Sequence, residues 1–148
     1  MKEWKVPRSY TGLPWHDIES VQIHGFGDAS PKAYGSCIYI VCLYKNHPVF
    51  SRLVISRARV APLKSVSLPR LELLGALLCA RLVRFVKKAL RLSDETDIRC
   101  WTDSRVTLTW IKGNPSWWKA FVANRVVEIQ EITNPANWGF VKGSNNEK

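Results

Sequence analysis

The sequence predicts an α/β fold, in which helices pack on a mixed five-stranded sheet. Three consecutive segments rich in β-branched and aromatic residues, at 21–28, 36–44 and 49–56, are separated by short breaks and predict an antiparallel meander. A long amphipathic segment and then a short strand-like segment follow them. A strand–helix–strand crossover normally makes its two strands parallel, so the sheet is expected to be mixed.

The long helix is expected over residues 69–90, where apolar side chains recur at helical spacing and form one stripe. Pro69 suits the first turn, because its missing N–H would have no partner there. Residues 97–103 (DIRCWTD) then predict the fourth strand. The crossover helix is therefore expected to link the meander to a strand parallel to one of its members.

Two further helices and a last strand are expected after the fourth strand. Ser104 is placed to cap a short helix that ends near Gly113, while Asn114 and Pro115 suit the cap and first position of the next helix. Residues 137–143 (NWGFVKG) predict the fifth strand, which gives the order β-β-β-α-β-α-α-β. Residues 1–20 are expected to form a lead-in segment, and residues 21–148 the domain.

The charge of the chain favours a polyanionic partner. Its net charge is +10 and its pI is about 9.8, a balance that points most often to nucleic acid. Several of the basic side chains are candidates for phosphate contacts, while others will be ordinary solvated charges. We expect these contacts from Arg57, Lys64, Arg70, Lys112, Lys119 and Arg125.

Other classes of protein are disfavoured. The four cysteines show no CxxC spacing and no accompanying histidine cluster, so a zinc site is not expected. Apolar runs around two of them suit a reducing compartment. The N-terminal residues lack the apolar region of a signal peptide, and no segment is long and apolar enough to cross a membrane. We therefore expect an intracellular protein, in the cytoplasm or the nucleus, and not a secreted one.

Three acidic residues stand at positions where carboxylates bind metal ions. Asp28 ends the first expected strand, although alone it fits equally well an aspartate that opens a turn. Asp103 ends the fourth, and alone it fits a helix cap slightly better. Glu72 lies in the expected first turn of the long helix, where the helix dipole would favour it. That helix face should lie against the sheet, however, and a buried carboxylate needs a partner.

Taken together, the three acids predict a metal site. If the first and fourth strands are neighbours, Asp28 and Asp103 meet at one edge of the sheet, and the start of the crossover helix brings Glu72 beside them. Such oxygen ligands suit Mg²⁺ or Mn²⁺. Two such ions about 3.5–4 Å apart activate water and stabilise the leaving oxygen of a phosphodiester. The pattern therefore predicts metal-dependent phosphoryl transfer on a basic surface.

Several stretches in sequence order resemble a known family. FGDASPKAYGSCIYI, SRARVAPLKSVSLPRLELLGALLCARL, and CWTDSRVTLTWIKG with WWKAFVANRVVEIQ are similar to the ribonuclease H region of Pao/BEL-type retrotransposon polyproteins, over about residues 20–144. The resemblance implies a ribonuclease H-like fold and an endonuclease that cleaves the RNA strand of an RNA–DNA hybrid. It also implies Asp28, Glu72 and Asp103 as catalytic metal ligands, and a parent polyprotein with protease, reverse transcriptase and integrase regions.

The sequence departs from this family at its C-terminal end. The family has a fourth acidic residue, on a helix past the last strand, in a segment like N-P-A-D. Here the chain reads VKGSNNEK, where Asn146 is the nearest match to the asparagine and Glu147 is the only nearby acid. We expect a domain truncated before its final helix, a weakly bound second metal ion, and weak or absent nuclease activity.

Two rival functions remain open at this point. An integrase-like transferase on the same fold would use Asp28, Asp103 and a helical glutamate such as Glu128 or Glu131, but the position of Glu72 between the two aspartates argues against it. A catalytically dead module that only binds nucleic acid would also fit the basic charge and the missing fourth acid.

Overall fold

The structure is a computed structural model, which describes residues 18–45, 49–62 and 66–142. Its elements follow the predicted order, with two short 3₁₀ turns in addition. The strands are β1 (Ile18–Ser30), β2 (Ala33–Tyr44), β3 (Phe50–Val60), β4 (Asp97–Thr102) and β5 (Trp138–Phe140). The helices are α2 (Leu68–Ala89), α3 (Arg105–Lys112) and α4 (Ala120–Ile132), and the 3₁₀ turns are η2 (Pro115–Trp117) and η3 (Pro135–Asn137).

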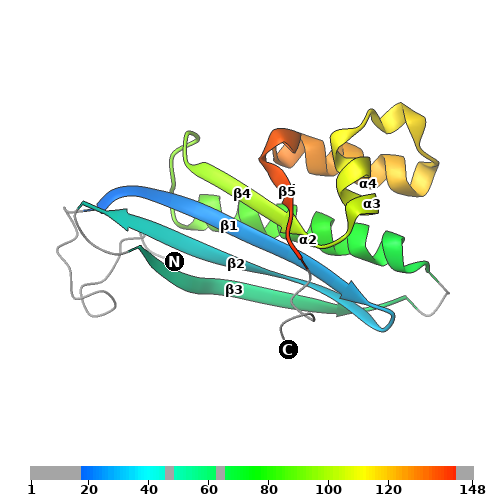
Figure 1. The fold of residues 1–148 in the computed structure, drawn as a ribbon, viewed down its shortest axis with the longest axis horizontal. Coiled ribbons are helices and arrows are strands. Elements are labelled where there is room, and N and C mark those ends of the chain that lie inside the picture. The colour runs from blue at the N-terminus through cyan, green and yellow to red at the C-terminus, as the bar shows by residue number, and fades with distance from the viewer. Residues whose placement is uncertain (1–17, 46–48, 63–65, 143–148) are drawn as a thin grey trace.

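The five strands form one mixed sheet in the order β3-β2-β1-β4-β5. β2 pairs antiparallel with β1 and with β3, and β4 pairs parallel with β1 and with β5. The crossover through α2 therefore places β4 beside the first strand (Figure 1). This confirms the predicted fold class, including the meander and the parallel fourth strand.

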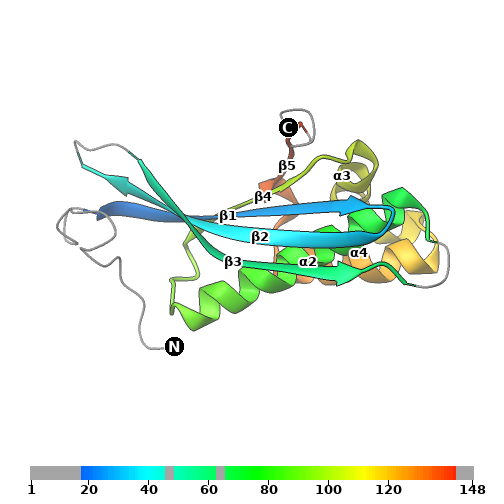
Figure 2. The ribbon, with the colours of Figure 1, turned by 90° about the horizontal axis from the view of Figure 1, so that it is seen from below.

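The core lies between the sheet and α2. Strand residues alternate between the two faces of a sheet, and Ile23 of β1 with Ile38 and Ile40 of β2 are almost fully buried on the helix side. Leu73 and Val83 of α2 belong to the same buried cluster. Burying such a side chain stabilises the fold by about 1.5–3 kcal/mol. Figure 2 shows the helices gathered on this one face, so no helix of the described residues covers the opposite face.

The helix expected to start at Pro115 begins later. Asn114 caps as predicted, because its side chain accepts a hydrogen bond from the Ser116 N–H (2.9 Å), but the turn closes after one 3₁₀ step and α4 starts only at Ala120. Trp118 is extended at this break and its ring packs against the core. The need to bury this ring explains why the helix does not run straight on from Pro115.

The ends of three strands also differ from the prediction. β1 starts at Ile18, inside the expected lead-in segment, and runs two residues beyond Asp28. β3 continues to Val60, because its pairing with β2 extends to Ala33. β5 has only three residues, of which Trp138 is buried.

Candidate metal centre

Asp28 and Asp103 meet because β1 and β4 are parallel neighbours. Gly27 of β1 stands opposite Thr102, the last residue of β4, and an aspartate follows each of them: Asp28 within β1 and Asp103 just past the end of β4. Figure 1 shows the C-terminal parts of both strands at the same end of the sheet as the start of α2. Asp28 does not end its strand as predicted, since it still pairs with Gly35 of β2.

Glu72 reaches the aspartates because α2 lies unusually close to β1. A Cβ on Gly75 would lie 2.8 Å from the Asp28 carbonyl oxygen, and one on Gly27 would lie 2.8 Å from the Gly75 carbonyl oxygen. Only glycine permits such backbone contact. Glu72 is the fifth residue of α2 and not part of its first turn, which corrects the prediction, but it still lies about one turn before Gly75.

The start of α3 fixes the position of the segment that carries Asp103. Ser104 caps this helix as predicted, because its hydroxyl accepts a hydrogen bond from the Thr107 N–H (3.1 Å). The Thr107 hydroxyl in turn donates to the Pro69 carbonyl oxygen of α2 (3.4 Å). These contacts tie the segment that carries Asp103 to the helix that carries Glu72.

The three carboxylates converge on one point. One oxygen from each of Asp28, Glu72 and Asp103 lies within 4.8 Å of the other two. Asp28 is exposed, whereas Glu72 and Asp103 are half-buried. Oδ1 of Asp28 accepts a hydrogen bond from the Ala29 N–H (2.8 Å). Oε1 of Glu72 and Oδ1 of Asp103 are buried without any hydrogen-bond partner, and such atoms call for a ligand or an ion.

Crowding of the three acids raises two of their pKa values. Burial, together with the negative charges of Asp103 and Asp28, raises the pKa of Glu72 from 4.5 to about 8. Burial and the charge of Asp28 also raise the pKa of Asp103. Both shifts mean that the ionised cluster is electrostatically unfavourable on its own.

A divalent cation fits this donor set. It would neutralise the mutual repulsion and supply a partner for the two buried carboxylate oxygens of Glu72 and Asp103. Donors that are all carboxylate oxygens suit Mg²⁺ or Mn²⁺, since these hard cations prefer oxygen ligands. The arrangement therefore has the chemistry of a Mg²⁺ or Mn²⁺ site.

We predict that the metal-free protein becomes less stable as the pH rises from about 4.5 to about 8. In this window Glu72 holds a proton in the folded protein and releases it on unfolding, because its folded pKa lies above its usual value of 4.5. Glu72 is half-buried, so solvent screening limits the expected loss to about 1 kcal/mol, or about 2–4 °C in Tm. Adding 10 mM MgCl₂ should raise Tm more at pH 8 than at pH 5, since protons compete with the cation.

Thermal unfolding of Glu72→Gln checks this prediction. The variant should be more stable than the parent protein at pH 8 without metal, and its response to MgCl₂ should be small. Glu131→Gln is the matched control, because Glu131 is exposed on α4 and outside the acidic cluster. A Glu72→Gln variant with the same pH and Mg²⁺ dependence as the control would contradict the assignment.

The basic residues predicted to contact phosphates do not form one group. Arg70 and Arg125 both lie over the Phe121 ring, at 4.9 and 3.9 Å from its centroid, and so share one surface. Lys112 donates to the Pro135 carbonyl oxygen (3.1 Å), and Lys119 is exposed just before α4.

One described residue of the predicted set lies elsewhere. Arg57 is exposed on the edge strand β3, at the other side of the sheet. Lys64 lies outside the described residues, as do Asn146 and Glu147.

The acids required by an integrase-like site are not brought together. Glu128 forms a two-point ion pair with Arg81, with distances of 2.6 and 2.8 Å, and this pair lowers its pKa. Among the described residues, the group of acids that converges is Asp28, Glu72 and Asp103. The geometry therefore favours the ribonuclease H arrangement of acids.

A groove beside the acids was not predicted. On the sheet face that α2 leaves open, a cavity of about 730 Å³ extends from His24 and Phe26 to Asp28 and Asp103. Trp101 stacks on His24 nearby, with ring centroids 6.4 Å apart. The available signal was the alternation along the two strands, which puts His24 and Phe26 of β1 and Tyr39 of β2 on the face opposite to Ile23 and Ile38.

Comparisons with known structures agree on the fold. RNase H1 from the halophilic archaeon Halobacterium salinarum is similar with a TM-score of 0.50 and 13% identity, over 85% of this chain and 89% of that one. LC11-RNase H1 in complex with an RNA/DNA hybrid is similar with a TM-score of 0.52 and 12% identity, over 86% of this chain and 88% of that one. At such identities the likeness shows the ribonuclease H fold.

Sequence comparisons are more specific. No relative was found among curated proteins. Within the described residues, no helix is long and apolar enough to cross a membrane. The family model described as the Pao retrotransposon-like RNaseH-like domain matches residues 1–104, a stretch that includes Asp28, Glu72 and Asp103. Because this match covers well over half of the sequence, the chain belongs to the family of Pao retrotransposon RNase H-like domains.

Proposed function

We propose that this protein is a metal-dependent endonuclease that cleaves the RNA strand of RNA–DNA hybrids during reverse transcription of a retrotransposon. The observation that carries the proposal is the convergence of three carboxylates, within 4.8 Å of one another, on a ribonuclease H fold. We further propose that the domain acts inside the cell, in the cytoplasm or the nucleus, as part of a polyprotein with reverse transcriptase and integrase regions.

The proposed roles of the three acids follow from their surroundings. Asp28, Glu72 and Asp103 would hold Mg²⁺ or Mn²⁺, which activates water and stabilises the leaving oxygen of the phosphodiester. Asp28 is the exposed member, so it faces the side from which substrate and water arrive. Glu72 and Asp103 are the less exposed members, and α2 and α3 fix their positions. Three carboxylates carry enough negative charge to neutralise one divalent cation but not two. We therefore expect the second ion to bind weakly.

Basic residues beside the acids would position the hybrid. Arg70 is two residues before Glu72 on α2, and Arg125 of α4 lies against the same Phe121 ring. Lys112 is exposed at the end of α3, and Lys119 is exposed just before α4. We propose that these four residues contact phosphates, which place the strand over the carboxylates without reading its sequence. The complex of LC11-RNase H1 with an RNA/DNA hybrid supports this type of substrate.

Cleavage of a hybrid with a labelled RNA strand tests the proposal. We expect slow RNA cleavage in 10 mM MgCl₂ or 1 mM MnCl₂, because the second ion binds weakly, none in EDTA, and none of a DNA duplex with the same sequence. The net charge of +10 favours hybrid binding even without metal. Tight hybrid binding without cleavage in either metal would instead support a module that only binds nucleic acid.

A further inference from the structure

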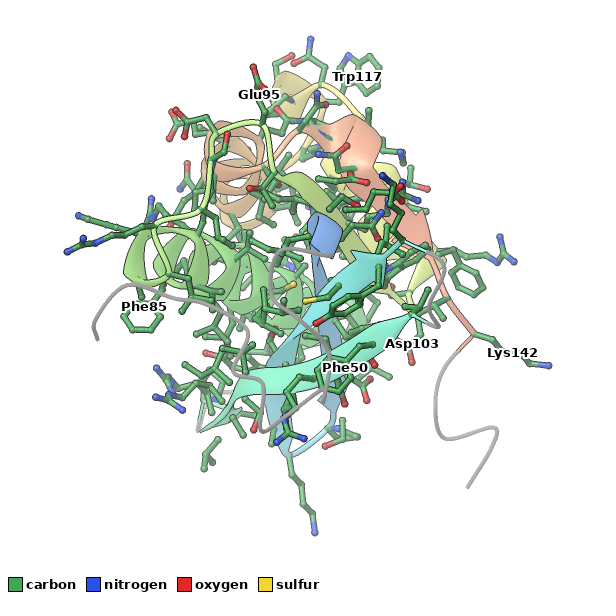
Figure 3. The ribbon with its side chains drawn as sticks, turned by 90° about the vertical axis from the view of Figure 1, so that its left-hand side faces the viewer. Phe50, Phe85, Glu95, Asp103, Trp117 and Lys142 are labelled. Carbon is green, nitrogen blue, oxygen red and sulfur yellow. The ribbon has the colours of Figure 1, made fainter. Side chains whose placement is uncertain are left out.

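A second cavity lies between α2 and the edge strand β3, away from the three acids. Its volume is about 330 Å³, and no member of the acidic cluster lines it. Leu77 and Leu78 of α2 form an apolar floor, with Ile55 of β3 on one side and Phe85 of α2 on the other. Phe85 is 59% exposed, a large apolar side chain left in solvent. Figure 3 shows it on the outer surface of α2.

The strand beside this groove has an open edge. β3 is the outermost strand of the sheet and pairs with β2 on one side only. It is eleven residues long and exposed along almost its whole length. An edge strand of this kind presents a row of unpaired backbone N–H and C=O groups that can accept another strand. Among the described elements, nothing occupies that side.

A register shift in β3 turns its basic residues toward the groove. Ile38 of β2 pairs with Ile55, whereas the next residue, Tyr39, pairs with Leu53, so one residue of β3 is left over as a bulge. Beyond the bulge, Ile55, Arg57 and Arg59 alternate along one face and line the cavity. The groove therefore combines an apolar floor with a rim of arginines.

Arg57 and Arg59 are available to a partner. Their Nη1 atoms donate only to carbonyl oxygens of their own strand, those of Ser56 (2.9 Å) and Ala58 (3.3 Å). Within the described part of the chain neither forms an ion pair, whereas Arg81 on the opposite wall is held by Glu128. Among the described residues, neither guanidinium group has an acidic partner, and both stand above an apolar floor. Such a surface favours a ligand in which carboxylates flank an apolar side chain.

We propose that this surface binds an extended acidic peptide segment of a partner protein. The segment would add to the sheet as a strand beside β3, with one apolar side chain in the groove and, two residues away on the same strand face, carboxylates that contact Arg57 and Arg59. A second copy of this chain is a poor occupant, because pairing of two β3 edges would place arginines near arginines. A nucleic acid would satisfy the arginines but leave Phe85 uncovered. The proposal is independent of nuclease activity.

Fluorescence anisotropy with a defined probe tests the proposal. The probe is a labelled ten-residue peptide whose odd positions are Glu, Phe, Glu, Leu and Glu, so that these side chains share one face of a strand, with Thr at the even positions. We expect saturable binding that falls at least about tenfold in R57E/R59E, because each substitution replaces attraction with repulsion. Phe85→Ala should weaken binding several-fold. Since Phe85 is exposed, this change should leave the fold intact. Amide hydrogen exchange over Phe50–Val60 should slow when the probe binds.

The matched control is K88E/R91E, which makes the same change of charge on exposed residues that do not line the groove. It should bind the probe like the parent protein. The proposal is overturned if the probe fails to saturate, if R57E/R59E binds like the control, or if a peptide with Lys in place of each Glu binds equally well. It is also overturned if an RNA–DNA hybrid displaces the probe and Phe85→Ala has no effect, since the surface would then be one for nucleic acid.

Discussion

Asp103→Asn is expected to lower the rate of hybrid cleavage about a thousandfold while making the metal-free protein more stable. A bound cation stabilises the transition state of phosphodiester cleavage by several kcal/mol, and about 4 kcal/mol corresponds to a factor of roughly a thousand. Asp103 lies within 4.8 Å of both other acids, so an amide there removes one of three charged ligands. The same amide relieves the repulsion that raises the pKa of Glu72, which stabilises the fold without metal.

The opposite signs of these two effects make the test sharp. Single-turnover cleavage is measured in MgCl₂, and thermal unfolding is measured in EDTA on the same preparations. Unfolding of a variant then cannot explain a loss of activity. Asp28→Asn should behave alike, whereas Glu131→Gln should match the parent protein because Glu131 is exposed and outside the cluster. Cleavage that survives both Asp103→Asn and a chelator would have to come from another site or from a contaminant.

The positions of the acids could be predicted from the sequence because they depend on local features. Strand ends and a helix start are marked by periodicity and by breakers such as Pro69, and the parallel pairing of β1 and β4 follows from the handedness of a crossover. Element boundaries depend more on tertiary packing: Glu72 lies just past the first turn of α2 and not in it, and α4 starts five residues later than predicted. Both errors leave the relevant side chains on the expected faces.

Features that depend on the packing of distant segments were not predicted. Arg57 was assigned to phosphate binding because it is basic, but only the strand order shows that it lies on an open edge beside α2. The partner of Glu128 could not be foreseen either, because Arg81 is on another helix, 47 residues away. Gly75 was one small residue in an apolar stripe, and nothing nearby in the sequence marks its contact with the Asp28 backbone.

Gly75→Ala is expected to destabilise the protein, although helix propensity predicts the opposite. In a helix interior alanine is favoured over glycine by about 1 kcal/mol. Here the new Cβ would lie 2.8 Å from the Asp28 carbonyl oxygen and 3.2 Å from the Asp28 nitrogen. Backbone atoms cannot rotate away, so α2 must move off β1, and overpacking of this kind costs about 1–3 kcal/mol. We expect Tm to fall by several degrees.

The same displacement should impair the metal site, because Glu72 lies one turn before Gly75 and would move away from Asp28 and Asp103. The affinity for Mg²⁺, measured from the rise in Tm with MgCl₂ concentration, and the rate of hybrid cleavage should both drop at least about tenfold. A misplacement of 1 Å at an active site can cost a factor of about a hundred in rate. Gly113→Ala is the matched control: its Cβ would meet mainly the side chains of Trp118 and Trp117, outside the acidic cluster. It should lower Tm but leave the response to Mg²⁺ intact. If Gly75→Ala raised Tm and kept full activity, the close contact between α2 and β1 would not be what positions Glu72.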